Sequence, residues 1–380
     1  MLASATSTVT AARSATTGLA LEILGRPVLL DEGLPAHPRA LGETQLGATL
    51  EVALVYSTPL LDLELGVGAH VRLPFAKNFD EAFGAAPIAW AELTPLDGVR
   101  LRLGTLRHTH GHHPAVFDET RAAYGRNLTA SYRRALAKST PRGLDSDPHL
   151  GAQQGAEVRA SLGPIELDAY LDWQLLETIE HREKLAFGAV AKAESRFLRG
   201  SAELRLSHYG GQLFTAIDPI RFDGLDPVRQ PTTYAGTLLI TPLRGPVHAE
   251  LGGSVVFAQG VGVNAENLPE STARADPNPK DHRFGIEPRV RLSLERVEES
   301  RTLELELGWR LWLPYDEGFF SEEGGPIYTG PRSHRFSLGT SLRADDVELR
   351  GRVDAIFTAG TSEVSYFALT ELTFRLREWL

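Results

Sequence analysis

Apolar and polar side chains alternate along most of this 380-residue chain, and that period of two limits its fold more than any other feature. In the stretch IELDAYLDWQL, from Ile165 to Leu175, every second residue is apolar and most residues between them are polar. Successive side chains of a strand point to opposite faces, so such a stretch forms a strand with one apolar and one polar face. The same pattern recurs at 61–73, 303–313 and 347–357. The chain is therefore predicted to be all-β.

Strands are predicted along nearly the whole chain, and the one clear helix candidate covers 118–138. A weak first strand lies near 18–25. The other predicted strands are 45–56, 61–73, 87–94, 99–107, 154–162, 165–175, 184–196, 199–208, 233–241, 246–258, 282–296, 302–313, 334–343, 346–358 and 363–380.

The connections between these strands alternate in length. Short ones lie at 57–60, 94–98, 163–164, 242–245, 297–300 and 344–346, and long ones at 74–86, 108–153, 209–232, 259–281 and 314–333. A soluble sandwich has no reason to keep this order, whereas a membrane barrel has short periplasmic turns and long outer loops. We predict an antiparallel transmembrane β-barrel of about 16 strands, with short periplasmic turns and long extracellular loops. The alternative is a large soluble β-protein, such as a sandwich or a solenoid.

The predicted domain organisation is simple. Residues 1–17 are expected to form a flexible N-terminal segment and residues 18–380 a single barrel. Loop 108–153 is the longest connection, and it either folds into the lumen or lies over the rim. The first residues lack the apolar core of a signal peptide, so this is either a cytoplasmic start or a chain whose signal peptide is missing.

Composition excludes several classes of function. The net charge of −10 argues against a nucleic-acid partner. Cysteine is absent, so disulfides, thiolate metal sites and cysteine nucleophiles are ruled out. The sequence contains no G-x-S-x-G, no Gly-rich phosphate loop and no H-E-x-x-H. We therefore expect no catalytic residues and no cofactor.

The last residues, ELTFRLREWL, form a closing strand with apolar residues at alternate positions, including Leu372, Phe374 and Leu376. Over residues 45–380 the arrangement resembles the porin-like outer-membrane β-barrels of Gram-negative bacteria. Such barrels typically end in an aromatic residue, whereas this chain ends in Leu380 with Trp379 one place earlier. The resemblance implies a location in the bacterial outer membrane, contact with its lipid, and passage of small hydrophilic solutes.

Arginines on the polar strand faces and in the longest loop are the candidate lumen residues, because a basic constriction favours anions. A wet lumen or a dense ion-pair network can hold such charges, whereas a dry core cannot hold them cheaply. The candidates for the lumen or its constriction are Arg121, Arg126, Arg133, Arg134, Arg289, Arg291, Arg310, Arg350 and Arg352.

Four histidines, His108, His110, His112 and His113, fall within the stretch HTHGHH. In a continuous strand the first three would share one face, which would suit a metal. Gly111 and the following proline break such a strand, and no acidic partner precedes the histidines. The sequence therefore favours a polar junction between strand and loop over a dedicated metal site.

Three functions remain open. The first is a passive outer-membrane pore for small hydrophilic solutes. The second is a structural or assembly barrel whose lumen is plugged and whose loops dock an envelope protein. The third is a soluble β-rich binding protein.

Overall fold

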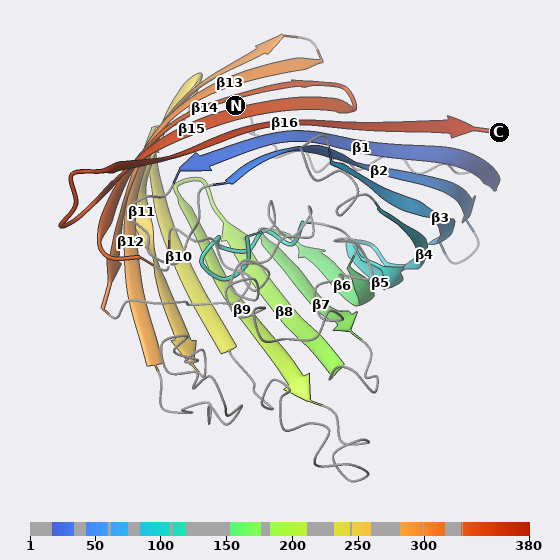
Figure 1. Ribbon diagram of the computed structural model, residues 1–380. Coiled ribbons are helices and arrows are strands. Elements are labelled where there is room, and N and C mark those ends of the chain that lie inside the picture. The colour runs from blue at the N-terminus through green and yellow to red at the C-terminus, as the bar shows by residue number, and fades with distance from the viewer. Residues whose placement is uncertain are drawn as a thin grey trace.

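The strands close into a single ring in the computed structural model (Figure 1). The structure describes residues 17–33, 43–59, 62–74, 84–106, 109–118, 153–175, 183–210, 232–243, 245–259, 282–298, 300–315, 328 and 330–380. Among these residues, no helix is long and apolar enough to cross a membrane. The helix candidate at 118–138 lies almost wholly outside the described residues.

Sixteen antiparallel strands form the ring, each paired with its neighbours in the sequence. They are β1 (Gly18–Gly33), β2 (Glu43–Thr58), β3 (Leu63–Pro74), β4 (Gly84–Leu96), β5 (Val99–Thr105), β6 (Gln154–Leu162), β7 (Ile165–Leu175), β8 (Glu183–Glu194), β9 (Leu198–Gly210), β10 (Thr232–Leu243), β11 (Val247–Gln259), β12 (His282–Glu298), β13 (Arg301–Pro314), β14 (Ser333–Ala344), β15 (Val347–Thr358) and β16 (Val364–Trp379).

The ring is closed by β1 and β16, whose register runs from Ala20 opposite Trp379 to Gly33 opposite Tyr366. The predicted all-β antiparallel barrel of 16 strands is thereby confirmed. The first strand is 16 residues long, twice the length predicted for it. Its pairing with β16 skips Arg26 and Pro27. Proline has no N–H to donate to a ladder, and its presence hid the second half of the strand in the sequence pattern.

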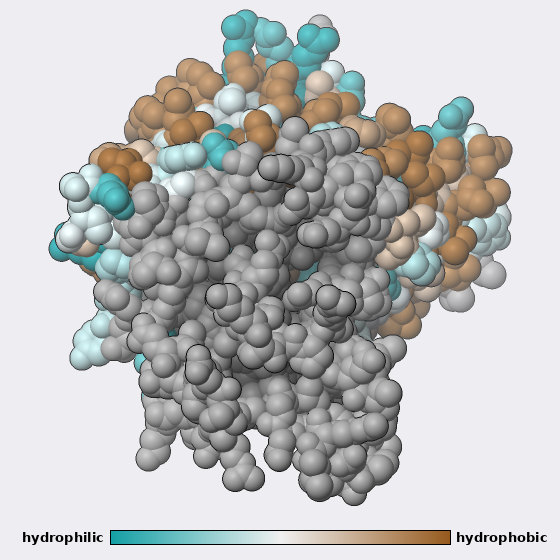
Figure 2. Space-filling view, viewed as in Figure 1, coloured by the Kyte–Doolittle hydropathy of each residue, from teal (hydrophilic) through white to brown (hydrophobic). Residues whose placement is uncertain are grey.

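The alternation places apolar side chains outside and polar ones inside. On the outer face Leu167, Leu305 and Val353 are 41%, 46% and 54% exposed. On the inner face Glu157 and Asp354 are buried. Where the outer surface is visible in Figure 2, apolar side chains cover much of it. This is the reverse of a soluble protein and is the surface that contact with lipid requires.

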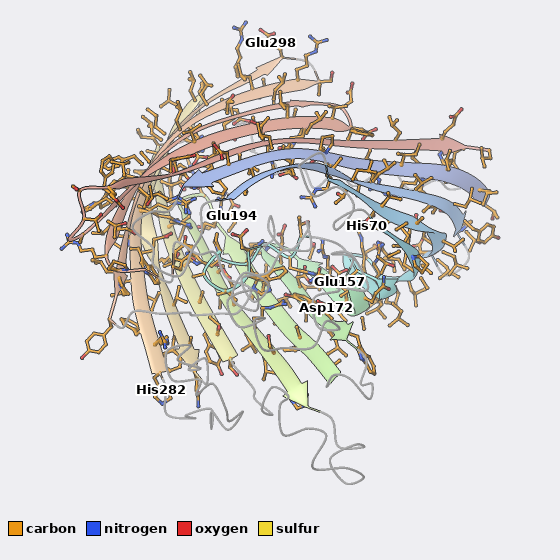
Figure 3. The ribbon with its side chains drawn as sticks, in the orientation of Figure 1. His70, Glu157, Asp172, Glu194, His282 and Glu298 are labelled. Carbon is orange, nitrogen blue, oxygen red and sulfur yellow. The ribbon has the colours of Figure 1, made fainter. Side chains whose placement is uncertain are left out.

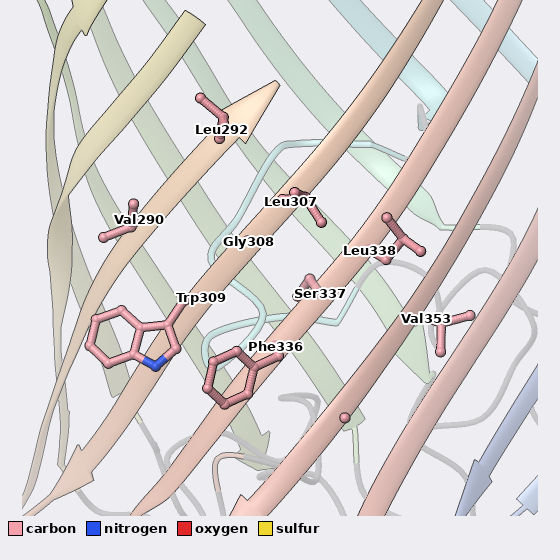
Figure 4. Close-up of a pocket in the computed structure, with 10 residues that line it drawn as sticks. Val290, Leu292, Leu307, Gly308, Trp309, Phe336, Ser337, Leu338 and Val353 are labelled. Carbon is pink, nitrogen blue, oxygen red and sulfur yellow. The ribbon is translucent and has the colours of Figure 1, made fainter. Parts of the chain in front are cut away.

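Aromatic side chains line up across neighbouring strands on the outer face. Tyr234 of β10 lies opposite Phe257 of β11, which lies opposite Phe284 of β12. Trp309 of β13 lies opposite Phe336 of β14, and both flank an apolar groove of about 510 Å³ (Figure 4). Aromatic rings prefer the level where a membrane meets water. All five aromatics lie in the halves of their strands nearer the long loops, which is the level expected for a membrane interface on that side.

Candidate functional site

The inner wall carries a row of arginines on three neighbouring strands. Arg289 of β12 is paired directly with Arg310 of β13, and Arg310 is paired directly with Arg335 of β14. Like charges directly opposite each other destabilise a sheet. The row therefore places positive charge at this level of the lumen at some cost in stability.

Two buried carboxylates offset part of that charge. Glu287 lies 3.8 Å from Arg310, and Asp354 accepts hydrogen bonds from Arg335 and from Arg352 of β15. No carboxylate in the described part of the chain contacts Arg289 within ion-pair distance. These arginines outnumber the carboxylates that contact them, so this stretch of wall is positively charged.

The next level of the wall has the opposite balance. Arg291 is surrounded by three carboxylates, at 3.5 Å from Glu250, 2.7 Å from Glu304 and 3.0 Å from Glu306. Its positive charge is therefore more than neutralised. Charge of both signs lines the lumen at both levels, with arginines in excess around Arg310 and carboxylates in excess around Arg291.

A segment of the longest loop, residues 109–118, lies inside the ring of strands and is called the docked segment below (Figure 1). It follows β5, which ends at Thr105, and Gly111 within it has a φ of +76°. That left-handed conformation favours glycine, and the proline that follows cannot continue a strand ladder. The sequence HTHGHHP therefore breaks the strand and lets the chain turn inward against the wall.

His110 is held between β6, β7 and the residue that precedes β6. Its Nδ1 lies 3.1 Å from Asp168 and 3.9 Å from Glu157. Its Nε2 lies 3.0 Å from the side-chain oxygen of Gln153. The imidazole stacks on the ring of Tyr170, with the centroids 3.6 Å apart. Figure 3 shows Glu157 in the interior of the barrel.

His112 and His113 continue the contacts along the wall. His112 Nε2 lies 2.9 Å from the hydroxyl of Tyr170, which also accepts a hydrogen bond from Arg205. The backbone N–H of His113 donates to Glu203, and its Nε2 lies 3.4 Å from Glu287. The buried histidines thus face carboxylates or the tyrosine on β6, β7, β9 and β12.

The segment ends in an apolar cluster within the barrel. Ala115 and Val116 are buried with Trp312, Tyr328 and Ile356. The Tyr328 hydroxyl donates a 2.7 Å hydrogen bond to Glu287. Burial and the neighbouring Glu287 carboxylate raise the pKa of Tyr328, so the hydroxyl stays a donor. This apolar cluster packs residues 109–118 against the inner wall.

The predicted site residues fall into three groups. Arg289, Arg310 and Arg352 come together on the wall, and Arg291 and Arg350 each lie in ion pairs nearer the short turns. His110, His112 and His113 are buried inside the barrel. The following lie outside the described residues: Arg121, Arg126, Arg133, Arg134 and His108.

The sequence pattern missed the partners of the histidines. The acids come from distant strands, Glu157 from β6, Asp168 from β7, Glu203 from β9 and Glu287 from β12. A search for acids near HTHGHH in the sequence could not find them. The sequence pattern places these acids on the polar faces of predicted strands, but it does not indicate that they contact this loop.

Replacing Tyr170 with Phe should destabilise the folded protein by about 1–3 kcal/mol. The change removes a hydroxyl that two buried groups contact, and unsatisfied buried polar groups cost about that much. Tyr366→Phe is the matched control, because the Tyr366 hydroxyl bonds Asp31 on the exposed face. Guanidinium unfolding in detergent measures both changes. Equal losses in the two variants would show that the docked segment does not depend on Tyr170.

The closed ring, apolar outer wall and charged inner wall define the structural class, a β-barrel of the kind that spans a membrane. No family model and no curated protein matches the sequence. Similar solved structures include OmpT of Vibrio cholerae lacking loop L8, an outer membrane protein, with 9% identity over 96% of this chain and 100% of that chain and a TM-score of 0.44. A bacterial polysaccharide outer membrane secretin has 10% identity over 94% of this chain and 98% of that chain, with a TM-score of 0.49. A triple-mutant Rhodopseudomonas blastica porin has 10% identity over 94% of this chain and 100% of that chain, with a TM-score of 0.42. This is a likeness of barrel architecture alone.

Proposed function

We propose that this protein is an outer-membrane pore of a Gram-negative bacterium through which small hydrophilic solutes pass passively. The observation that carries the proposal is the inside-out distribution of side chains, with exposed leucines outside and buried charges within. A wall that holds so many ionised groups needs water or counter-ions beside them. Lipid contacts the outer face, and the lumen offers the charged path.

The arginine row gives this pore a preference for anions. Positive charge on the wall of a narrow path attracts anions and repels cations. Arg289 and Arg310 face each other across neighbouring strands, and the docked segment reduces the space beside them by contacting Glu287 from within. Small anions such as chloride, phosphate or carboxylates are therefore the favoured solutes.

Replacing Arg289 with Gln should lower the ratio of anion to cation permeability about two- to fivefold. A unit charge a few ångströms from a permeating ion contributes up to about 1 kcal/mol even in water. Arg296→Gln is the control, since Arg296 lies at the exposed end of the same strand, beside Glu298. The reversal potential across a planar bilayer under a salt gradient reports the ratio. A protein selective for cations, or one unchanged by Arg289→Gln, would refute the assignment.

A second candidate function is supported by the apolar cluster inside the barrel. Val116 and Trp312 are buried in the interior together with Tyr328. Such packing suits a plug, and the barrel would then be a structural or assembly component that docks an envelope protein through its loops. Current through single barrels separates the two candidates, because a plugged barrel does not conduct.

The third possibility, a soluble β-rich binding protein, is distinguished by solubility. A membrane barrel needs detergent to stay dispersed and changes its gel mobility when boiled. A soluble protein does neither. The exposed apolar band of leucines, valines and aromatics argues for the membrane barrel.

A further inference from the structure

Three potential metal ligands converge where the docked segment meets β6 and β7. They are His110 from the segment, Glu157 from β6 and Asp168 from β7, and their donor atoms lie within 4.8 Å of one another. The side chains of His110 and Glu157 are fully buried, and that of Asp168 is 12% exposed. Buried carboxylates need a compensating positive charge.

The hydrogen bonds around His110 decide which ring nitrogen faces the carboxylates. The side-chain amide nitrogen of Gln153 donates to Asp172, 3.4 Å away, so the oxygen of Gln153 is turned toward His110. That oxygen accepts a hydrogen bond, so Nε2 of His110 carries the proton. In the neutral ring Nδ1 then presents its lone pair to the oxygens of Asp168 and Glu157.

A lone pair aimed at two carboxylate oxygens is repulsive unless a proton or a metal ion lies among them. Histidines that bind metals commonly donate their other ring N–H to an oxygen acceptor, which fixes the tautomer, as Gln153 does here. The Tyr170 ring stacked on His110 fixes the orientation of the imidazole. In addition, Oδ1 of Asp168 is buried without a hydrogen-bond partner.

The spacing of the three atoms suits a metal ion. Ligand atoms about 2.1 Å from a tetrahedral zinc ion stand about 3.4 Å apart. The distances from Nδ1 of His110 are 3.1 Å to Asp168 and 3.9 Å to Glu157, on either side of that value. Small side-chain movements would equalise them.

Arg159 occupies the neighbourhood of these carboxylates. Its guanidinium contacts Glu157 and lies 3.0 Å from Asp168, and it also donates to the carbonyl of Thr109. Its side chain is 27% exposed, so it can withdraw toward the lumen. Arg159 competes with a metal ion for these two carboxylates, so removal of its positive charge should strengthen metal binding.

We propose that His110, Glu157 and Asp168 bind a divalent transition-metal ion, with one imidazole nitrogen and two carboxylate oxygens as ligands. This donor set suits zinc or manganese better than magnesium or calcium, which bind through oxygen alone. The ion would tie the docked segment to β6 and β7. The inference goes beyond the proposed pore and does not depend on conduction.

Titration of the folded, detergent-solubilised full chain with Zn²⁺, followed calorimetrically, tests the proposal. We expect binding of one ion per chain, lost in His110→Gln and weakened at least tenfold in Glu157→Gln. Gln153→Leu should weaken it by about 10–100-fold, the usual effect of removing a group that orients a ligand. Arg159→Gln should strengthen binding, a gain that general damage to the fold cannot produce.

His112→Gln is the matched control, because His112 bonds Tyr170 rather than the three ligands. Binding should survive in it. If Zn²⁺ binding is lost in His112→Gln but remains full in Glu157→Gln, the histidines bind the ion without the carboxylates. That result would overturn the proposal. Absence of stoichiometric binding in the natural sequence would also overturn it, whatever Arg159→Gln does, because the site would then be an ion-pair network alone.

Discussion

A chain that lacks its last nine residues, Leu372–Leu380, is expected not to form a folded barrel at all. These residues supply the half of β16 that pairs with Ala20–Gly25 of β1 and with Val347–Leu349 of β15. Without them, the backbone groups of two strands face lipid unpaired. Each such group costs several kcal/mol in a bilayer, and an open edge also invites aggregation.

Heat-modifiable gel mobility in detergent measures this loss. The full chain should migrate differently before and after boiling, and the truncated chain should migrate identically in both cases. Deleting Met1–Thr17, which precede β1, is the control and should leave the shift intact. A truncated chain that still shifts and resides in the membrane would contradict closure of the ring by β16.

Leu305→Arg should destabilise the barrel by about 2–4 kcal/mol, the cost of arginine on a lipid-facing wall near the middle of a bilayer. Leu305 is 46% exposed on the outer face of β13, four residues nearer the short turn than Trp309. Unfolding in guanidinium, starting from the barrel folded into lipid vesicles, gives the difference.

The control must place arginine on the inner face at the same level. Glu304 is unsuitable because it forms an ion pair with Arg291, so its replacement would remove a second interaction. Ser341 of β14 lies opposite Glu304, and an arginine there would face that carboxylate. Ser341→Arg should therefore change stability little. Equal damage from Leu305→Arg and Ser341→Arg would contradict the assignment of outer and inner faces.

The barrel could be predicted from the sequence because its determinants are local. Alternation over Ile165–Leu175 fixes which side chains share a face, and loop length separates the two rims. The sequence predicts too short a first strand because Pro27 interrupts its pattern. Pairing on both sides by β2 and β16 overrides that local signal over most of the strand.

The interior site could be predicted only in part. Arg289, Arg310 and Arg352 were identified because polar faces of barrel strands point inward. The direct pairing of Arg289 with Arg310 depends on strand register, which a single sequence does not specify. The contacts of His110 with Glu157 and Asp168 depend on how a loop folds back, and loop conformation has no periodicity to follow.

Single-channel recording in a planar lipid bilayer shows directly whether this barrel is a pore. We expect discrete, reproducible current steps from the purified full chain, with a reversal potential that indicates anion preference. The docked segment contacts the inner wall from His110 to Val116. It should therefore narrow the lumen without closing it. Barrels that insert into the bilayer, shift their gel mobility on boiling and yet carry no current would contradict the pore and favour the plugged structural barrel.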